Sequence, residues 1–368
     1  MPTFSSITGQ DGAVGALRRA LASEQLAGSY LFLGQPGVGR TTAARAFAQA
    51  AACLSPVKDP FDSCGVCSSC RMAEAENHPE IVIVKPAGEQ MLIGQFWDRP
   101  NRPPGILSHT LSFAPSIGRK RVYILEQAES FSESAANSLL KVLEEPPSYA
   151  LFILLAPHLS RILPTIVSRS QSIRIRPISH DLLVSLIQEK YDLPFEESSA
   201  LASYTEGKTG HAIRFARDPV ARAERNRIID LAEQFPSATK GRALLLAEQL
   251  RKSAGQIKAL NFEASSPDNE EESESGAKER AGQRQYSVLI DIFISVYRDL
   301  CALRSCGEYA PVVNMDRKES FLSLASQMSV GAGMSALDSL FRARRRLTAN
   351  VSIPLLTDAL AISLTSSH

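Results

Sequence analysis

The sequence predicts an α/β domain built on a parallel sheet, followed by regions that are helical throughout. In the first half of the chain, short unbroken apolar runs alternate with helix-forming segments, which is typical of a sheet covered on both faces. In the second half, apolar residues recur at spacings of three and four positions. The chain has 368 residues, 44% of them hydrophobic, which is enough for two or three domains of roughly 150 residues with their own cores.

Five apolar runs are expected to form the strands. The first, Ser29–Leu33, leads into a glycine-rich turn and then into an alanine-rich segment that favours a helix. The other four expected strands are, in chain order, Ile81–Pro86, Arg121–Leu125, Ala150–Ala156 and Ser172–Pro177. Between the third and fourth strands, a helix is expected to begin after Ser132 or Ser134 and to end before Pro146.

The pattern along the chain divides it into three expected regions. Residues 1–177 contain the five strands, and residues 178–218 form a small helical unit interrupted by glycines. Residues 219–368 are helical in pattern and enclose a run over 265–283 that is rich in Glu, Ser and Gly. Because this run has almost no apolar residues, it is predicted to be a disordered loop.

Charge and hydropathy restrict the location and the partners. The 40 Lys and Arg residues nearly balance the 39 Asp and Glu residues, so any contact with nucleic acid is expected to come from a local patch. The first thirty residues lack the features of a signal peptide. The apolar run Tyr149–Pro157 is far shorter than the ~20 residues that cross a bilayer. A soluble cytoplasmic protein without a membrane partner is therefore expected.

A phosphate-binding loop is predicted after the first strand. Gly34–Thr41 reads GQPGVGRT, which matches the pattern G-x-x-x-x-G-K-[ST] except that Arg40 replaces the lysine. Glycines let successive backbone N–H groups turn toward a phosphate, the following helix adds its positive end, and the hydroxyl of Thr41 can reach magnesium. The predicted binding residues are Gly34, Gly37, Gly39, Arg40, Thr41 and Thr42. Arginine keeps the charge but lacks the compact ammonium of lysine, so weak binding of ATP or ADP is compatible with this loop and hydrolysis is not expected. An ordinary glycine turn is the alternative.

Four of the six cysteines lie within 18 positions and predict a metal site. These are Cys53, Cys64, Cys67 and Cys70. In a reducing compartment such clustering favours metal binding over disulfides, and four thiolates satisfy a tetrahedral zinc ion. Two alternatives remain: unliganded thiols, and an iron–sulfur cluster, whose usual fourth cysteine follows the C-x2-C-x2-C triplet instead of preceding it. We predict a structural zinc module over residues 53–70.

These motifs, together with the segments NSLLKVLEEPP and IVSRS, occur in an order and at spacings that resemble the bacterial DNA polymerase III clamp-loader family of gamma/tau and delta-prime subunits. The resemblance covers the first 218 residues and, more weakly, the C-terminal helices. It implies an AAA+ nucleotide-binding domain over 1–177, a helical lid over 178–218 and a helical collar for oligomerisation over 219–368. The implied partners are gamma/tau and delta subunits and, through the complex, the sliding clamp and primed DNA.

The resemblance also identifies positions that active gamma/tau subunits use for hydrolysis. Their third strand ends in Asp-Glu, where this chain has Glu126 and Gln127. A neutral amide cannot accept a proton from the attacking water, so this replacement removes the base. The alternative is that Glu126 takes over this role with a shifted register.

Two further positions of the family pattern are changed. The sensor of the terminal phosphate would be Ala156 and Pro157, which have no side chain that hydrogen-bonds. The lid arginine of the family corresponds to Gly210, although Arg214 follows one helical turn later as an alternative. These changes predict a non-hydrolysing delta-prime-type subunit of the polymerase III holoenzyme, with no ATPase or polymerase activity of its own. An active ATPase motor of the gamma/tau type and a standalone DNA-dependent NTPase are the competing hypotheses.

One motif of the phosphate chemistry is retained. Ser168, Arg169 and Ser170 stand where the family has Ser-Arg-Cys. The resemblance implies that Arg169 is an arginine finger, which supplies planar positive charge to the ATP of a neighbouring subunit. A solvated or salt-bridged surface arginine is the alternative.

Overall fold

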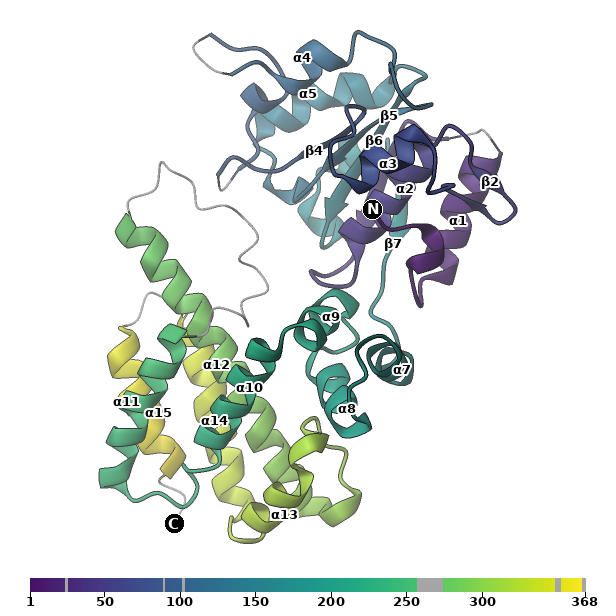
Figure 1. The fold of residues 1–368 in the computed structure, drawn as a ribbon. Coiled ribbons are helices and arrows are strands. Elements are labelled where there is room, and N and C mark those ends of the chain that lie inside the picture. The colour runs from purple at the N-terminus through teal and green to yellow at the C-terminus, as the bar shows by residue number, and fades with distance from the viewer. Residues whose placement is uncertain (24–25, 89, 101–102, 257–273, 348–351, 366–368) are drawn as a thin grey trace. The chain divides into compact units, whose positions relative to one another are not determined.

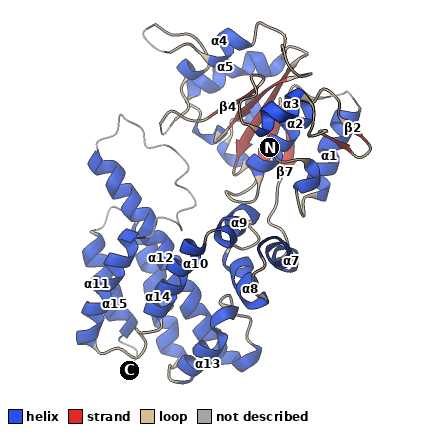
Figure 2. Ribbon diagram, viewed as in Figure 1, coloured by secondary structure: helices blue, strands red, loops and turns tan. Residues whose placement is uncertain are grey.

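The computed structural model describes residues 1–23, 26–88, 90–100, 103–256, 274–347 and 352–365. The chain divides into two compact units, Met1–Ile178 and Ser179–His368 (Figure 1). Figure 2 shows the strands gathered in the first unit. Both of the expected helical regions, 178–218 and 219–368, fall almost entirely within the second unit.

A five-stranded parallel sheet forms the centre of the first unit. Its strand order is β4-β5-β6-β1-β7, and every pair of neighbours is parallel. The strands are β1 (Ser29–Leu33), β4 (Ile81–Val84), β5 (Arg121–Leu125), β6 (Ala150–Ala156) and β7 (Gln171–Arg174). A separate hairpin consists of β2 (Val57–Lys58) and β3 (Phe61–Asp62). The predicted parallel sheet is confirmed. Its strands β4 and β7 end before Pro86 and Pro177, which the predicted runs include.

Helices cover both faces of this sheet. They are α1 (Asp11–Ala22), α2 (Arg40–Ala52), α3 (Ser68–Glu74), α4 (Ile106–Thr110), α5 (Glu133–Glu144) and α6 (Pro164–Val167). Side chains of a strand alternate between its two faces, so Tyr30 and Phe32 of β1 join the core cluster that contains Phe47 of α2. Leu31 and Leu33 join the opposite cluster, which includes apolar residues of α5.

Local sequence determines where α2 and α5 begin and end. Every residue from Ala46 to Ala52 of α2 is buried, which is feasible because the alanine side chains let the helix pack closely on its neighbours. The hydroxyl of Ser132 accepts a hydrogen bond from the Ala135 N–H at 3.2 Å and caps α5, so Ser132 is the cap rather than Ser134. The helix ends at Glu144, before the two prolines, as predicted.

The second unit is helical throughout its described part, as predicted. Its helices are α7 (His180–Tyr191), α8 (Phe195–Tyr204), α9 (Thr209–Arg217), α10 (Pro219–Ala232), α11 (Lys240–Gln256), α12 (Glu274–Cys306), α13 (Lys318–Ser326), α14 (Val330–Leu347) and α15 (Ile353–Thr365). Phe235 meets Phe293 of α12 edge to face, with ring centroids 5.6 Å apart. The buried carboxylate of Asp299 accepts N–H groups of Val313 and Asn314 and so fixes the following loop to α12. None of the described helices is both long and apolar enough to span a membrane.

The predicted loop over 265–283 requires a correction. Residues 265–273 lie outside the described residues, but the chain is helical from Glu274 onward, as the first part of α12. The prediction is therefore wrong for residues 274–283. The segment GAKERAGQRQ is polar, yet most of its residues favour a helix, and it continues into the buried apolar side of α12. Polarity alone did not distinguish a polar helix from a loop.

Candidate functional site

The glycine loop connects the carboxyl end of β1 to the start of α2. Gly37 and Gly39 have φ angles of 83° and 98°, which side-chain-bearing residues rarely adopt. At Gly34, a Cβ atom would lie 2.3 Å from the carbonyl oxygen of Ile175. Larger residues are therefore excluded at these three positions, at two by conformation and at Gly34 by close contact with the neighbouring backbone.

The first turn of α2 presents backbone donors beside this loop. Gly39 precedes the helix, and no side chain caps it. Within the described residues, no group accepts a hydrogen bond from the backbone N–H of Arg40, Thr41 or Thr42. Such donors at the positive end of a helix attract an anion. The backbone thus has the form that phosphate binding requires.

The side chain of Arg40 lies close to carboxylates of the same chain. Burial lowers the pKa of Arg40, while the negative charges of Glu129 and Glu126 act in the opposite direction. The Nη1 atom of Arg40 and the Oε2 atom of Glu129 are both buried without a hydrogen-bond partner among the described residues. Part of the positive charge that a phosphate would need is therefore offset by the protein itself. Glu129 is a site residue that the sequence motifs do not mark; its position in the short 3-10 turn after β5 is the signal that could have identified it.

Residues that follow neighbouring strands lie beside the glycine loop at the carboxyl end of the sheet. The N–H of Gly34 donates to the carbonyl of Ala156 at 3.2 Å, so the ends of β1 and β6 are joined. Glu126 and Gln127 follow β5, the next strand along, and Gln127 is exposed with a left-handed φ of 55°. Ala156 and Pro157 are buried and carry no side-chain donor. The structure therefore brings the predicted positions of the base and the sensor to the loop, with residues unsuited to either task.

Gly210 and Arg214 lie in the second unit. Gly210 is in the first turn of α9, and Arg214 follows one turn later on the same helix. That Gly210 stands in the place of the lid arginine, with Arg214 as the alternative, stays a prediction.

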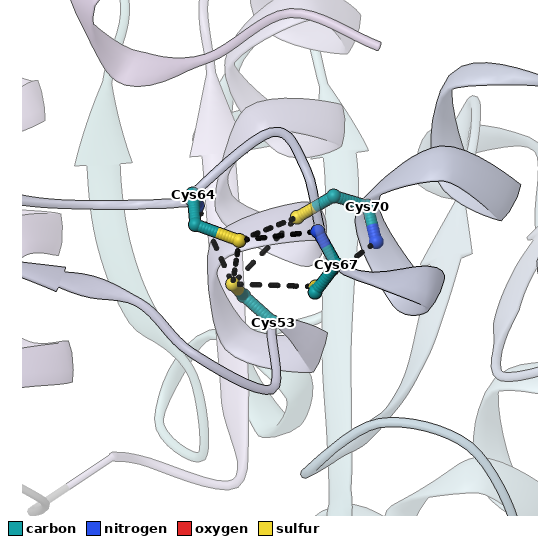
Figure 3. A group of neighbouring side chains, drawn as sticks. All are labelled: Cys53, Cys64, Cys67 and Cys70. Carbon is teal, nitrogen blue, oxygen red and sulfur yellow. Dashed lines mark hydrogen bonds between the residues drawn. The ribbon is translucent and has the colours of Figure 1, made fainter.

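The four clustered cysteines come together at the other end of α2 (Figure 3). Cys53 directly follows α2, Cys64 follows the β2–β3 hairpin, and Cys67 and Cys70 lie at the start of α3. Their sulfur atoms all lie within 4.8 Å of one another. The separations between sulfur atoms are 3.6 Å for Cys53–Cys64 and Cys53–Cys70, 3.9 Å for Cys53–Cys67 and 4.0 Å for Cys64–Cys70. Four ligands at roughly 2.3 Å from a tetrahedral ion would be about 3.8 Å apart, so the cluster can hold one such metal ion.

Backbone donors prepare these sulfur atoms to bind a cation. The N–H groups of Cys64, Cys67 and Cys70 donate to the sulfur atoms of Cys53, Cys64 and Cys67 respectively, each at 3.4 Å. Burial opposes ionisation of the Cys67 thiol, but the N–H groups of Cys70 and Leu54 and the adjacent thiols outweigh it and lower its pKa to about 6. Burial raises the pKa of Cys53 and Cys70, so loading a metal must release protons.

The guanidinium of Arg169 pairs with Glu144, the last residue of α5. The Nε atom donates to Oε1 of Glu144 at 2.7 Å, and Nη2 donates to the same oxygen. The Nη1 atom donates to the carbonyl of Thr165 at 3.0 Å and to the hydroxyl of Ser168 at 3.3 Å. About a third of the Arg169 side chain, 32%, remains exposed. The salt bridge that was one of the alternatives for Arg169 is therefore present, with the side chain still at the surface.

A parallel sheet with a glycine loop directly between its first strand and a helix has the architecture of phosphate-loop proteins. Residues 9–179 match the family described as DNA polymerase III, delta subunit. The chain is 25% identical over 348 residues to DNA polymerase III subunit delta' of Bacillus subtilis, a match that covers 95% of this chain and 94% of that protein. The chain is thus similar to DNA polymerase III subunits, and the resemblance inferred from its motifs is confirmed.

Other relatives match over a smaller part of their length. The DNA polymerase III subunit tau/gamma of Haemophilus influenzae is 29% identical over 230 residues, which cover 61% of this chain and 32% of that protein. The chain therefore spans about a third of that relative. A DNA polymerase III gamma subunit-related protein of Thermotoga maritima has a solved structure that aligns with a TM-score of 0.44 at 14% identity, covering 95% of this chain and 99% of the other.

Proposed function

We propose that this chain is a clamp-loader subunit of the delta-prime type, which supports ATP hydrolysis by its neighbours without hydrolysing ATP itself. The observation that carries the proposal is the replacement of hydrolytic groups around an otherwise intact glycine loop. Gln127 is exposed and lacks a carboxylate, and Ala156 and Pro157 offer no contact to a terminal phosphate. The match to a delta' protein over nearly its whole length supports the same role.

The proposed role assigns a part to each region of the chain. Residues 1–177 form the AAA+ domain, residues 178–218 the lid, and residues 219–368 the collar through which subunits associate. The proposed partners are gamma/tau and delta subunits, with the sliding clamp and primed DNA bound by the whole complex in the cytoplasm. Arg169 then completes the ATP site of an adjacent gamma/tau subunit.

Nucleotide binding in the chain's own loop is proposed to be weak. The N–H groups of the loop and of the first turn of α2 can still contact a phosphate. Arg40, however, is next to the carboxylates of Glu126 and Glu129, which repel an anion. ATP or ADP can therefore bind without the charge arrangement that speeds hydrolysis.

We propose zinc as the metal held by the four cysteines. Tetrahedral sites with four thiolate ligands are typical of structural zinc, and all four positions here are filled by sulfur. No position is left for water or a substrate, so the ion would stabilise the region between α2 and α3 and would take no part in catalysis.

The isolated chain is expected to hydrolyse no ATP above background, with or without primed DNA. Gln127→Glu alone should not restore turnover, because Arg40, Pro157 and Gly210 still differ from the active pattern. Steady-state phosphate release from the purified chain measures this. A robust DNA-stimulated turnover by the wild-type chain would overturn the proposal and favour a gamma/tau motor.

The role in the complex is tested by reconstituting the loader from gamma/tau and delta subunits with and without this chain. Clamp- and DNA-dependent ATP hydrolysis should require the chain, and the Gln127→Glu variant should support it as well as the wild type does. If the remaining subunits load the clamp at the full rate without the chain, the proposed function is wrong.

A further inference from the structure

We propose that Glu144 restrains the arginine finger, holding Arg169 within its own subunit until a phosphate of the neighbouring site takes the place of the carboxylate. This inference rests on the proposed function, in which Arg169 acts on the ATP of an adjacent subunit. It adds a residue whose charge competes with that ATP for the same guanidinium.

The hydrogen bonds of Arg169 leave little of its guanidinium free. A guanidinium has five N–H donors, and four of them are used within the described residues: two by Glu144, one by Thr165 and one by Ser168. Bidentate binding of a phosphate needs two parallel N–H groups on one edge. Arg169 must therefore release a present partner before it can bind a phosphate in this way.

Glu144 is the partner whose release matters most. It occupies the Nε–Nη2 edge and is the only charged acceptor among the three, whereas Thr165 and Ser168 offer a neutral carbonyl and a hydroxyl. Its negative charge also reduces the attraction of Arg169 for a phosphoryl group. The pair is accessible for exchange, because 32% of the Arg169 side chain and 47% of the Glu144 side chain are exposed, and exposed ion pairs are weak.

The backbone beneath Arg169 is fixed while its side chain is exchangeable. The hydroxyl of Ser29, at the start of β1, donates to the carbonyl of Arg169 at 2.7 Å and lies 3.1 Å from the hydroxyl of Ser170. A change of partner at the guanidinium therefore needs only a rotation of the side chain. The same fixed backbone therefore supports Arg169 whether its guanidinium binds Glu144 or a phosphate.

The test uses the reconstituted loader with Glu144→Gln, which removes the charge and keeps the size of the side chain. Without the competing carboxylate, Arg169 should engage the neighbour more often, and kcat/KM for clamp- and DNA-dependent ATP hydrolysis should rise about two- to fivefold. A structural defect would lower this value and not raise it. Glu145→Gln is the matched control, because Glu145 is the exposed adjacent carboxylate, and it should leave the rate unchanged.

A double mutant separates this inference from the proposed function. The gain from Glu144→Gln should vanish when Arg169 is alanine, since Glu144 acts through that guanidinium. If Arg169→Ala is slow but Glu144→Gln matches or falls below the wild type, or if its gain persists without Arg169, the restraint is wrong and the finger stands. If Arg169→Ala is itself as fast as the wild type, the finger fails, and the restraint fails with it.

Discussion

Arg169→Ala should slow ATP hydrolysis about 10³-fold or more at the one neighbouring ATP site that this chain is proposed to complete, while leaving assembly of the loader intact. The prediction rests on a contrast: Gln127, Ala156 and Pro157 stand at the positions predicted for hydrolytic groups and are unsuited to that task, whereas Arg169 stands at the position predicted for the finger and lies at the surface. Arg169→Lys should be nearly as slow, because an ammonium cannot present the planar fork of a guanidinium. Pre-steady-state hydrolysis by the reconstituted loader measures the loss at one site.

Arg161→Ala provides the matched control for this prediction. Arg161 is an exposed arginine a few positions earlier in the same region and belongs to no phosphate motif, so its removal should leave hydrolysis unchanged. Equal rates for the Arg169→Ala and wild-type complexes, with normal assembly of both, would show that Arg169 is an ordinary surface arginine.

Loss of the metal is expected to destabilise the first unit strongly. One zinc ion per chain should be found by elemental analysis, and Cys70→Ser should lower the thermal midpoint by about 10 °C or more. Structural zinc contributes about 10–16 kcal/mol of binding free energy in small peptides, which is comparable to the whole stability of a domain. Cys70 is fully buried and packs beside the end of α2, so its loss also affects the core.

Cys306→Ser is the control, because Cys306 is exposed on α12 and lies outside the cluster. It should leave both the zinc content and the thermal midpoint unchanged. Substoichiometric zinc in the wild type, or iron accompanied by sulfide, would contradict the assignment.

The sequence predicted those features whose determinants are close together along the chain. β1, the glycine loop and α2 are consecutive, so apolar runs, glycines and alanines each indicated the correct element. The four cysteines lie within 18 positions, so their spacing alone indicated a cluster. The helix over residues 274–283 was missed, because a polar helix and a loop can have similar composition.

Contacts between distant segments were not predictable from the pattern. Glu144 and Arg169 are 25 residues apart, and their pairing depends on how α5 and α6 pack. Gln10 is buried and its side-chain amide bonds both the N–H and the carbonyl of Arg176, which is 166 positions later. Nothing in the local sequence around Glu144 or Gln10 indicates its partner, because only the folded sheet brings these segments together.

The position of β1 in the sheet has a consequence for the synthesis of the chain. Within the described residues, β1 pairs only with β6 and β7, and Ser29 faces Phe152, about 120 residues later. At roughly 5–20 residues per second, the first strand emerges from the ribosome about 6 to 25 seconds before its first partner. During that interval an apolar strand with both edges open must avoid pairing with other chains. The glycine loop therefore cannot take its final shape until the ribosome has completed β6, whose carbonyl at Ala156 holds Gly34.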